Sequence, residues 1–286
     1  MAEPKTLALL GCGLMGGSFA LAAQQAHAID HVIGYSVPAK TAEYFYQQEV
    51  IQSVAQTAAQ AVSQADVVLI ATPVAAIAPL LAEIAPALPD HALIMDVGST
   101  KRSIQLAAQQ VLGTHYHRFI PAHPIAGKEK AGHSDPFASL YQGKTVVLCP
   151  DEHTLPIALE QAQQLWQAVG AIPKIMDATA HDRGLGAVSH LPHLIAFAYM
   201  DALLNQTDSE QLLALGGPGF RDFSRIAGCD ATVWRDILPD NQDQVLPLLQ
   251  AVRQSLDQLE HVITQHDTPA LEALLSRASQ ARIHWK

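Results

Sequence analysis

The stretch TLALLGCGLMGGS, residues 6–18, decides the fold of this chain. An apolar run, residues 7–10, leads directly into Gly11, Gly13 and Gly16, which form a GxGxxG pattern. In a strand–turn–helix unit the first glycine permits a tight turn, the second lets the backbone approach a pyrophosphate, and the third lets the helix pack closely on the strand. The N-terminus of that helix would present free N–H groups and a partial positive charge to phosphate. The pattern therefore predicts a dinucleotide-binding site.

The first 176 residues alternate short apolar runs with longer amphipathic stretches. The runs predicted as strands are 7–10, 31–34, 67–71, 92–96, 119–122, 145–149 and 172–176. The predicted helices are 16–27, 41–49, 57–64, 74–87, 101–112 and 154–169. Apolar runs of this kind suit strands that are buried on both faces. Their alternation with helices predicts a doubly wound parallel sheet with right-handed crossovers.

The predicted strands stop at residue 177, and helical spacing takes over. The helical segments expected beyond it are 179–204, 208–215, 230–238, 241–266 and 269–284. We therefore expect an α/β fold with two domains: a Rossmann domain over residues 1–176 and an all-helical domain over residues 177–286. The second is expected to contact substrate and to mediate a homodimer, because its apolar surface is large for a monomer.

Composition excludes several classes of partner. The formal net charge is −10, from 17 basic and 27 acidic side chains, so neither nucleic acid nor an anionic membrane is an electrostatic partner. The three cysteines are far apart and odd in number, which fits a reducing compartment. The N-terminus does not resemble a signal peptide, and no apolar run reaches the roughly 18 residues of a membrane span. A cytoplasmic protein that binds a small molecule is expected.

Cofactor preference depends on the end of the second strand. An acidic residue there normally binds the adenosine ribose of NAD, but this chain has Ser36 at that position and Lys40 nearby. Both side chains can accept a 2′-phosphate, which favours NADP or dual use; alternatively, Ser36 only caps the turn. Thr72 and Pro73 follow another strand, either as cofactor contacts or as a turn. The expected cofactor contacts are Gly11, Gly13, Leu14, Met15, Gly16, Ser36, Thr72 and Pro73.

Two polar residues are predicted at the carboxyl ends of strands, where ligands bind in this fold. Ser99 follows the run 92–96 and is a candidate for helix N-capping, for catalysis, or for both. His123 follows the run 119–122 and is followed by Pro124. Histidine exchanges protons near neutral pH, so His123 is the candidate catalytic base.

The helical half contributes two histidines three residues apart. The spacing of His190 and His193 is compatible with a shared metal ion, but no third ligand stands at a recognised spacing. We therefore expect no metal, with one histidine binding substrate and the other structural.

Three arginines lie close together in this acidic chain. Arg221, Arg225 and Arg235 suit bidentate recognition of a carboxylate. Arg221 and Arg235 are expected instead to pair with the neighbouring Asp222 and Asp236. Arg225 is therefore the predicted substrate residue.

In order and combination, these motifs resemble the prephenate and arogenate dehydrogenase family of tyrosine biosynthesis. The motifs are GxGxxGGS at 11–18, DxGSxK at 96–101, HPIAGxE at 123–129, SHLPH at 189–193, GFRDFSR at 219–225 and WRD at 234–236. The resemblance implies an NAD(P)-dependent oxidative decarboxylation of prephenate to 4-hydroxyphenylpyruvate, of arogenate to tyrosine, or of both.

The resemblance also implies roles for individual residues. His123 accepts the proton of the ring hydroxyl, Ser99 positions that histidine and the hydroxyl, and Arg225 holds the ring carboxylate. His193 lies near the substrate side chain and Trp234 lines the site. We expect activity to fall below a pH near about 6.5, the ordinary pKa of histidine.

One departure from the family pattern affects the choice of substrate. Lys128 stands where many members carry a small polar residue, and it would add positive charge near the substrate side chain. Neither His193 nor Lys128 offers an acid for the ammonium group of arogenate. This favours prephenate.

Two other functions remain open from the sequence. A 3-hydroxyacid dehydrogenase also joins a Rossmann start to a helical domain, but it would use a lysine on the first long helix, and residues 179–204 contain none. A non-catalytic dinucleotide sensor needs the glycine turn, but it does not need Ser99, His123, His193 and Arg225 together.

Overall fold

The computed structural model describes residues 5–126 and 135–285. Its main sheet has six parallel strands in the spatial order β3-β2-β1-β4-β5-β6. The strands are β1 (Thr6–Leu10), β2 (His31–Tyr35), β3 (Ser53–Val54), β4 (Val67–Ile70), β5 (Leu93–Asp96) and β6 (Phe119–Ile120). This order is that of the doubly wound dinucleotide-binding fold. The predicted fold class is confirmed, although the short β3 was not expected.

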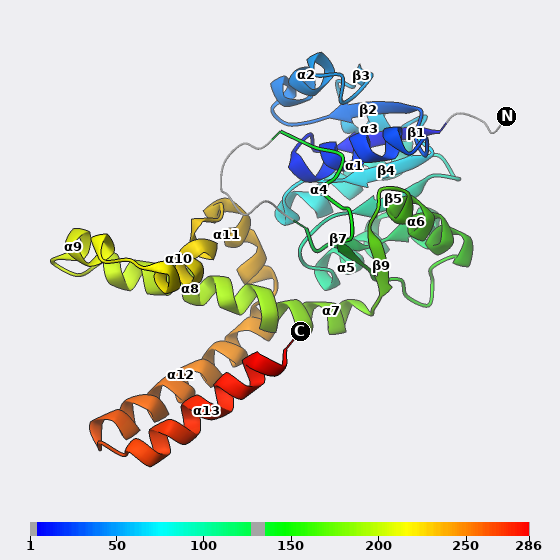
Figure 1. Cartoon of the computed structure of the whole chain (residues 1–286). Coiled ribbons are helices and arrows are strands. Elements are labelled where there is room, and N and C mark those ends of the chain that lie inside the picture. The colour runs from blue at the N-terminus through cyan, green and yellow to red at the C-terminus, as the bar shows by residue number, and fades with distance from the viewer. Residues whose placement is uncertain (1–4, 127–134, 286) are drawn as a thin grey trace.

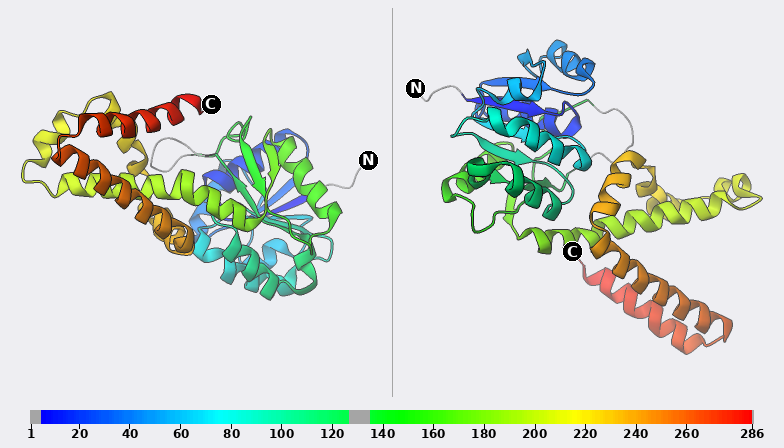
Figure 2. Two further views of the ribbon diagram at one scale, coloured as in Figure 1. Left: turned by 90° about the horizontal axis from the view of Figure 1, so that it is seen from below. Right: turned by 180° about the vertical axis from the view of Figure 1, so that it is seen from behind.

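Helices cover both faces of this sheet (Figures 1 and 2). They are α1 (Leu14–Gln25), α2 (Ala39–Gln47), α3 (Ala58–Val62), α4 (Val74–Ile84), α5 (Arg102–Val111) and α6 (Pro156–Ala168), with 3-10 turns η1 (Ala85–Ala87) and η2 (Gly113–Arg118). Successive residues of β1 serve opposite cores: Leu7 and Leu9 pack with Phe19 and Trp166, whereas Leu10 packs with Ile84. Burial on both faces explains why the strands are continuously apolar.

A second, three-stranded sheet was not expected. It contains β7 (Ala122–Pro124), β8 (Thr145–Leu148) and β9 (Ile172–Ile175), and β7 pairs with β8 antiparallel. The run expected as one strand, 119–122, is divided at Pro121, which has no N–H to donate to a ladder. His123 therefore lies within β7, opposite Val147, and does not follow a strand of the main sheet.

The helical half begins with α7 (Ala178–Leu185), the π-helical segment η3 (Gly186–His190) and α8 (Leu191–Leu204). It continues with α9 (Ser209–Ala214), α10 (Pro218–Ser224), η4 (Arg225–Gly228), α11 (Ala231–Asp240), α12 (Gln242–Thr264) and α13 (Thr268–His284). The helices α12 and α13 lie side by side and project away from the main sheet (Figure 1). The helix α10 was not among the expected helical segments. Proline is tolerated there, since it occupies the first helical turn.

One helical stretch of the described chain, Ala178–Leu204, is long and apolar enough to cross a membrane when judged by length and composition alone. The expectation that no segment reaches this threshold is therefore wrong. Only 17% of the apolar window of this stretch is buried in the single chain. The stretch packs against α10, η4 and α12.

Candidate active site

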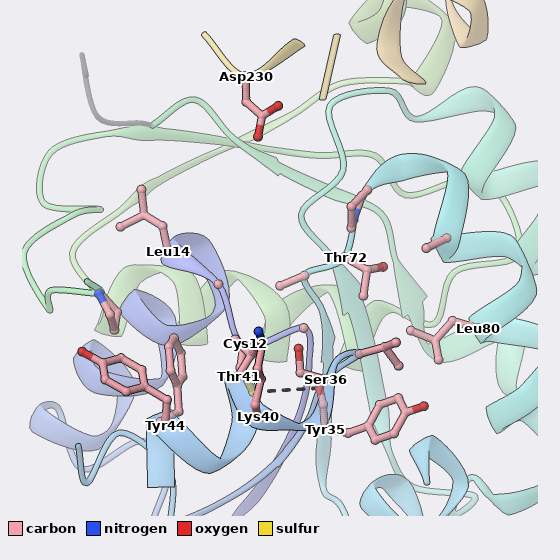
Figure 3. A pocket seen from close by; sticks show the side chains of 18 of the residues that line it. Cys12, Leu14, Tyr35, Ser36, Lys40, Thr41, Tyr44, Thr72, Leu80 and Asp230 are labelled. Carbon is pink, nitrogen blue, oxygen red and sulfur yellow. Dashed lines mark hydrogen bonds between the residues drawn. The ribbon is translucent and has the colours of Figure 1, made fainter. Parts of the chain in front are cut away.

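A cavity of about 1200 Å³ opens at the carboxyl ends of β1, β2 and β4 (Figure 3). Six of the eight expected cofactor contacts line it: Gly11, Gly13, Leu14, Ser36, Thr72 and Pro73. Lys40 also lines it, from the first turn of α2. Met15 and Gly16 are not part of this lining; Met15 packs against the core on the α1 side of the sheet.

The three glycines differ in what surrounds them. Gly11 has a φ of +104°, and a Cβ there would lie 2.5 Å from the Ala71 carbonyl oxygen. A Cβ on Gly16 would lie 2.6 Å from Leu9 Cδ1. By contrast, a Cβ on Gly13 would meet nothing within 4 Å. Gly11 and Gly16 are thus required by the protein itself, whereas the space beside Gly13 is free for a ligand.

The residues of this cavity fit a dinucleotide. The N-terminus of α1, which starts directly after Gly13, has no side-chain cap, so its N–H groups can bind phosphate. The Thr72 hydroxyl is buried and has no hydrogen-bond partner in the described chain. Such a group needs a partner, and one from a ligand in the cavity would satisfy it. Asp230, at the N-terminus of α11, faces the cavity from the helical half (Figure 3).

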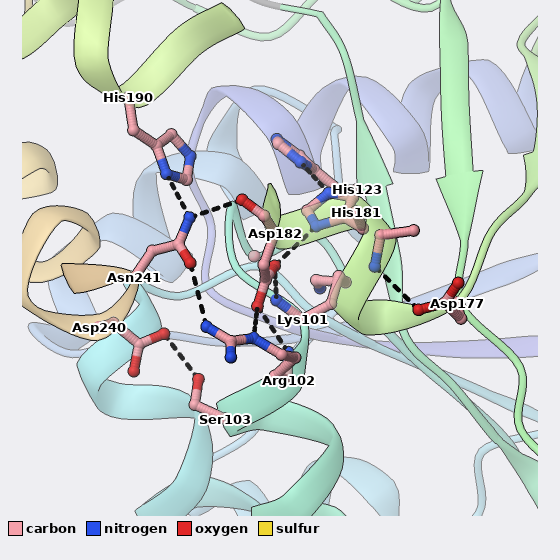
Figure 4. Close-up of polar contacts among 12 residues, drawn as sticks. Lys101, Arg102, Ser103, His123, Asp177, His181, Asp182, His190, Asp240 and Asn241 are labelled. Carbon is pink, nitrogen blue, oxygen red and sulfur yellow. Dashed lines mark hydrogen bonds and ion pairs between the residues drawn. The ribbon is translucent and has the colours of Figure 1, made fainter. Parts of the chain in front are cut away.

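His123 is held by a chain of buried polar groups (Figure 4). Its Nδ1 lies 2.8 Å from Nε2 of His181, and Nδ1 of His181 lies 2.8 Å from a carboxylate oxygen of Asp182. Burial, and then the nearby His181, Lys101 and His190, hold the pKa of His123 well below its usual range. The loss of activity at acidic pH, expected near pH 6.5 from the sequence, is therefore expected at lower pH.

A buried ion pair fixes the backbone beside His123. Lys101 Nζ contacts the Asp96 carboxylate and donates a hydrogen bond to the Ala122 carbonyl at 2.8 Å. The same carboxylate accepts from the N–H groups of Gly98 and Ala122. The end of β5 is thereby tied to the start of β7. The DxGSxK motif thus has a structural function that the sequence analysis did not assign.

Ser99 is half-buried in this turn, two residues before the N-cap of α5. The expectation that Ser99 caps the helix is wrong, since the N-cap is Lys101 and no side chain of this turn caps the helix. The free N–H groups of Lys101 and Arg102 donate to Asp182 instead, at 2.8 and 3.0 Å. A cap from 80 residues further along the chain leaves the Ser99 hydroxyl available for other contacts.

A second cluster lies in the helical half. His193 stacks on Trp234 with ring centroids 3.9 Å apart, and its Nδ1 lies 2.8 Å from the Ser189 carbonyl. Burial, followed by the charge of Arg225, lowers the pKa of His193, and η4, which begins with Arg225, packs against α8, the helix of His193. These three predicted substrate residues therefore lie together.

His190 connects this cluster with His123. Its ring meets Trp234 edge-on at 6.0 Å, and its charged form would lower the pKa of His123. Its Nδ1 accepts a hydrogen bond from Asn241 Nδ2, so it has the structural role expected for one of the two histidines. Within the described residues no group of three potential ligands could hold a metal ion.

The outcome for the remaining charged residues is mixed. Arg235 pairs with Asp236 at 2.9 Å, as expected. No ion pair joins Arg221 to Asp222 in the described part of the chain, so that expectation is wrong. Lys128 lies outside the described residues. His181 and Asp182 were missed, because a His–Asp pair at the start of a helix has no distinctive spacing.

Comparison with known proteins agrees with this arrangement. Residues 19–174 match the nucleotide-binding domain of prephenate dehydrogenase, and residues 177–277 match its dimerization domain. The chain is 31% identical to cyclohexadienyl dehydrogenase of Zymomonas mobilis, over 99% of this chain and 96% of that protein. It is 33% identical to prephenate dehydrogenase of Bacillus subtilis, over 97% of this chain and 75% of that protein.

A solved structure shares the whole architecture. Prephenate dehydrogenase of Aquifex aeolicus, in complex with hydroxyphenyl propionate and NAD+, superposes with a TM-score of 0.91 at 30% identity, covering 100% of this chain and 99% of that one. These matches do not favour a 3-hydroxyacid dehydrogenase or a non-catalytic sensor. The glycine turn, the cavity and two domain matches that together cover most of the sequence lead to one conclusion: the chain belongs to the prephenate dehydrogenase family and is an NAD(P)-dependent dehydrogenase.

Proposed function

We propose that this enzyme oxidises and decarboxylates prephenate to 4-hydroxyphenylpyruvate, with arogenate as the alternative substrate. One arrangement supports the proposal: His123 of β7 bonds to His181 of α7, and His193 stacks on Trp234 in the helical half, where η4, which begins with Arg225, packs against α8. The helix of Trp234, α11, is preceded by Asp230, which lines the dinucleotide cavity. The family relationship supplies the substrate class. The arrangement supplies a base and a cation, the two groups that a cyclohexadienol carboxylate needs.

The reaction assigns a task to each residue. His123 takes the hydroxyl proton of the substrate as hydride leaves the same carbon, and a bound nicotinamide accepts that hydride. The ring carboxylate then departs as CO2, its bonding electrons make the ring aromatic, and His123 returns the proton to the phenolic oxygen. Base catalysis of this kind contributes about 10²–10⁴-fold. Ser99 donates to the hydroxyl oxygen and keeps it oriented.

Arg225 is proposed to hold the ring carboxylate before it leaves. A guanidinium remains protonated at any relevant pH, so it binds and does not take part in proton transfer. His193, kept neutral by burial and by Arg225, is proposed to face the substrate side chain, with the stacked Trp234 as a wall. Lys128 would add positive charge there. This group of residues offers no acid for an ammonium group, which supports prephenate over arogenate.

The cofactor is proposed to be NADP, or either nucleotide. Ser36 and Lys40 both line the cavity at the end of β2, where an acid would select NAD. A hydroxyl and an ammonium are both donors, and donors suit a 2′-phosphate.

The active form is proposed to be a homodimer formed by the helical half. A groove of about 910 Å³ there is lined almost entirely by apolar side chains, from α8, α10 and α12. Val188, Leu204 and Leu256 are also largely exposed in the single chain. An apolar surface of this extent on helices is typical of a subunit interface. Light scattering after size exclusion should give a mass of about twice 30.7 kDa.

Steady-state kinetics test the proposed reaction. Purified enzyme is mixed with prephenate or arogenate and with NAD+ or NADP+, and the absorbance of the reduced nicotinamide is followed. His123→Asn should lower kcat by about 10²–10⁴-fold with little change in KM. His27→Asn is a matched control, since His27 is exposed and has a positive φ, which asparagine tolerates. Wild-type enzyme that oxidises neither substrate, or full activity of His123→Asn, would refute the proposal.

A further inference from the structure

The catalytic base of the proposed function does not act alone in this structure. His123 bonds to His181, and His181 bonds to Asp182; His181 and Asp182 both lie in α7 (Figure 4). His123 is half-buried, and the His181 side chain is fully buried. The order of proton donors and acceptors along this chain can be worked out from the other partners of Asp182.

Asp182 is an ionised carboxylate with a full set of donors. One oxygen accepts from Lys101 N, and the other accepts from Arg102 N and Arg102 Nε, at distances of 2.8–3.1 Å. Burial opposes ionisation, but the bonds from His181, Arg102 and Lys101 hold the pKa of Asp182 below its usual range. A carboxylate in this state only accepts, so Nδ1 of His181 must donate to it.

The tautomer of His123 follows from that assignment. A neutral His181 that donates through Nδ1 has a lone pair at Nε2, so Nδ1 of His123 donates to it across 2.8 Å. Nε2 of His123 is then unprotonated, and it is the nitrogen left for the substrate proton.

We propose that His181 and Asp182 are positioning residues for His123: they fix its proton on Nδ1 and share the positive charge that forms when Nε2 takes the substrate proton. As that proton arrives, the Nδ1 proton shifts toward His181 Nε2, and the charge spreads toward the Asp182 carboxylate. No atom or electron is gained or lost in this step. The reverse shift follows when Nε2 returns its proton to the phenolic oxygen. The inference rests on the proposed role of His123 as the base.

The surroundings of His123 make this support necessary. The other charged or titratable groups that face it come from α5 and η3, and they are Lys101 and His190. Both disfavour a positive charge on His123. Asp96 is engaged by Lys101 and by two backbone N–H groups. In the described part of the chain, Asp182 is therefore the carboxylate placed to offset the imidazolium, and it acts through His181.

Two variants separate this role from a structural one. In His181→Gln, Asp182 still caps α5. The glutamine side-chain oxygen can still accept a hydrogen bond from His123 Nδ1, but an amide group cannot share the positive charge of the imidazolium. Asp182→Asn removes the carboxylate and with it the fixed orientation of His181. His190→Asn is the matched control: His190 is buried and hydrogen-bonded, like His181, but it is not bonded to His123.

The expected results differ in kcat and in pH profile. His181→Gln should lower kcat about tenfold, and Asp182→Asn about 100-fold, since a base without its orienting carboxylate loses up to about 10⁴-fold in the serine-protease case. KM should change less than about threefold. Asp182→Asn should shift the acidic limb of kcat/KM to lower pH, because loss of the carboxylate disfavours protonated His123. His190→Asn should not move that limb to lower pH.

A measurement independent of turnover completes the test. Nitrogen-15 NMR of the imidazoles in the wild-type protein should show His123 protonated on Nδ1 and free on Nε2. An Nε2-protonated His123, or His181→Gln with unchanged kcat, would overturn the inference even if Asp182→Asn fails to fold. Wild-type protein that turns over neither substrate would instead refute the proposed function, and the NMR result would still decide the tautomer.

Discussion

Adding one methyl group at two positions of the same glycine turn should have opposite consequences. In Gly16→Ala the new Cβ would lie 2.6 Å from Leu9 Cδ1, 2.7 Å from the Gly11 carbonyl oxygen and 2.8 Å from Ala71 Cβ. Only the leucine can move easily, so α1 must shift away from β1. In Gly13→Ala the new Cβ meets nothing within 4 Å. We therefore expect the first variant to lose stability and the second to lose cofactor affinity.

The magnitudes follow from the packing. Overpacking of this kind costs about 1–3 kcal/mol, and alanine regains less than about 1 kcal/mol of helix propensity at Gly16, so a net loss near 1–2 kcal/mol is expected. Gly13 has φ −112° and ψ −172°, an extended conformation open to alanine, so its variant should stay within about 0.5 kcal/mol of wild type. If the pyrophosphate of the cofactor approaches the backbone at Gly13, the methyl group added in Gly13→Ala should weaken cofactor binding at least about tenfold, or 1.4 kcal/mol.

Urea unfolding followed by circular dichroism gives the stabilities, and calorimetric titration with NAD+ and NADP+ gives the dissociation constants. Each variant serves as the control for the other, because both add the same group to the same turn. The reasoning fails if Gly13→Ala binds both nucleotides as tightly as wild type. It also fails if Gly13→Ala is destabilised as much as Gly16→Ala.

Three further outcomes are expected. Arg225→Gln should raise KM for prephenate about 10–100-fold with a smaller change in kcat, whereas Arg221→Gln should not; a loss confined to kcat would contradict carboxylate binding. Ser36→Asp should lower the ratio of kcat/KM with NADP+ to that with NAD+ by at least about tenfold, because a carboxylate accepts from a ribose hydroxyl and repels a 2′-phosphate; an unchanged ratio would remove Ser36 from cofactor selection. Burial lowers the pKa of His190 to about 4, so the unfolded chain binds the proton first, and the free energy of unfolding should fall as pH drops from about 6.5 toward 4, by at most about 3 kcal/mol. Urea melts at pH 7 and pH 5 should show this loss in wild type and less of it in His190→Asn, and equal losses would contradict the assignment.

Local signals explain why much of the fold could be predicted. The glycine turn and the apolar runs depend on residues near one another in sequence, and β1, β2, β4 and β5 lie close to their expected bounds. The division at Pro121 was missed because an apolar run hid a residue that cannot pair. The short β3 carries too few residues for a period to be visible. Both features depend on tertiary contacts, which a local sequence pattern does not show.

In the site too, residues within short motifs could be predicted, whereas roles that depend on residues distant in sequence could not. His123, Arg225 and His193 stood out because each is an unusual side chain within a short motif. The capping of α5 could not be predicted, because its cap, Asp182, comes from another domain and replaces the expected Ser99. His181 was missed for the same reason: its function depends on two partners, His123 and Asp182, and only one of them is its neighbour in sequence.

Because the chain is acidic, the pairing of its cations with carboxylates affects where an anionic substrate can bind. Among the described residues, Lys101, Arg102 and Arg235 each contact a carboxylate, whereas no ion pair involves Arg225. A paired cation has little affinity left for a ligand, so an unpaired guanidinium beside a neutral His193 is where an anion gains most. The proposed substrate has two carboxylates, one on the ring and one on the side chain. An unpaired guanidinium suits the ring carboxylate, which must be held until it leaves, and neutral hydrogen-bonding groups suit the side chain, which does not change in the reaction.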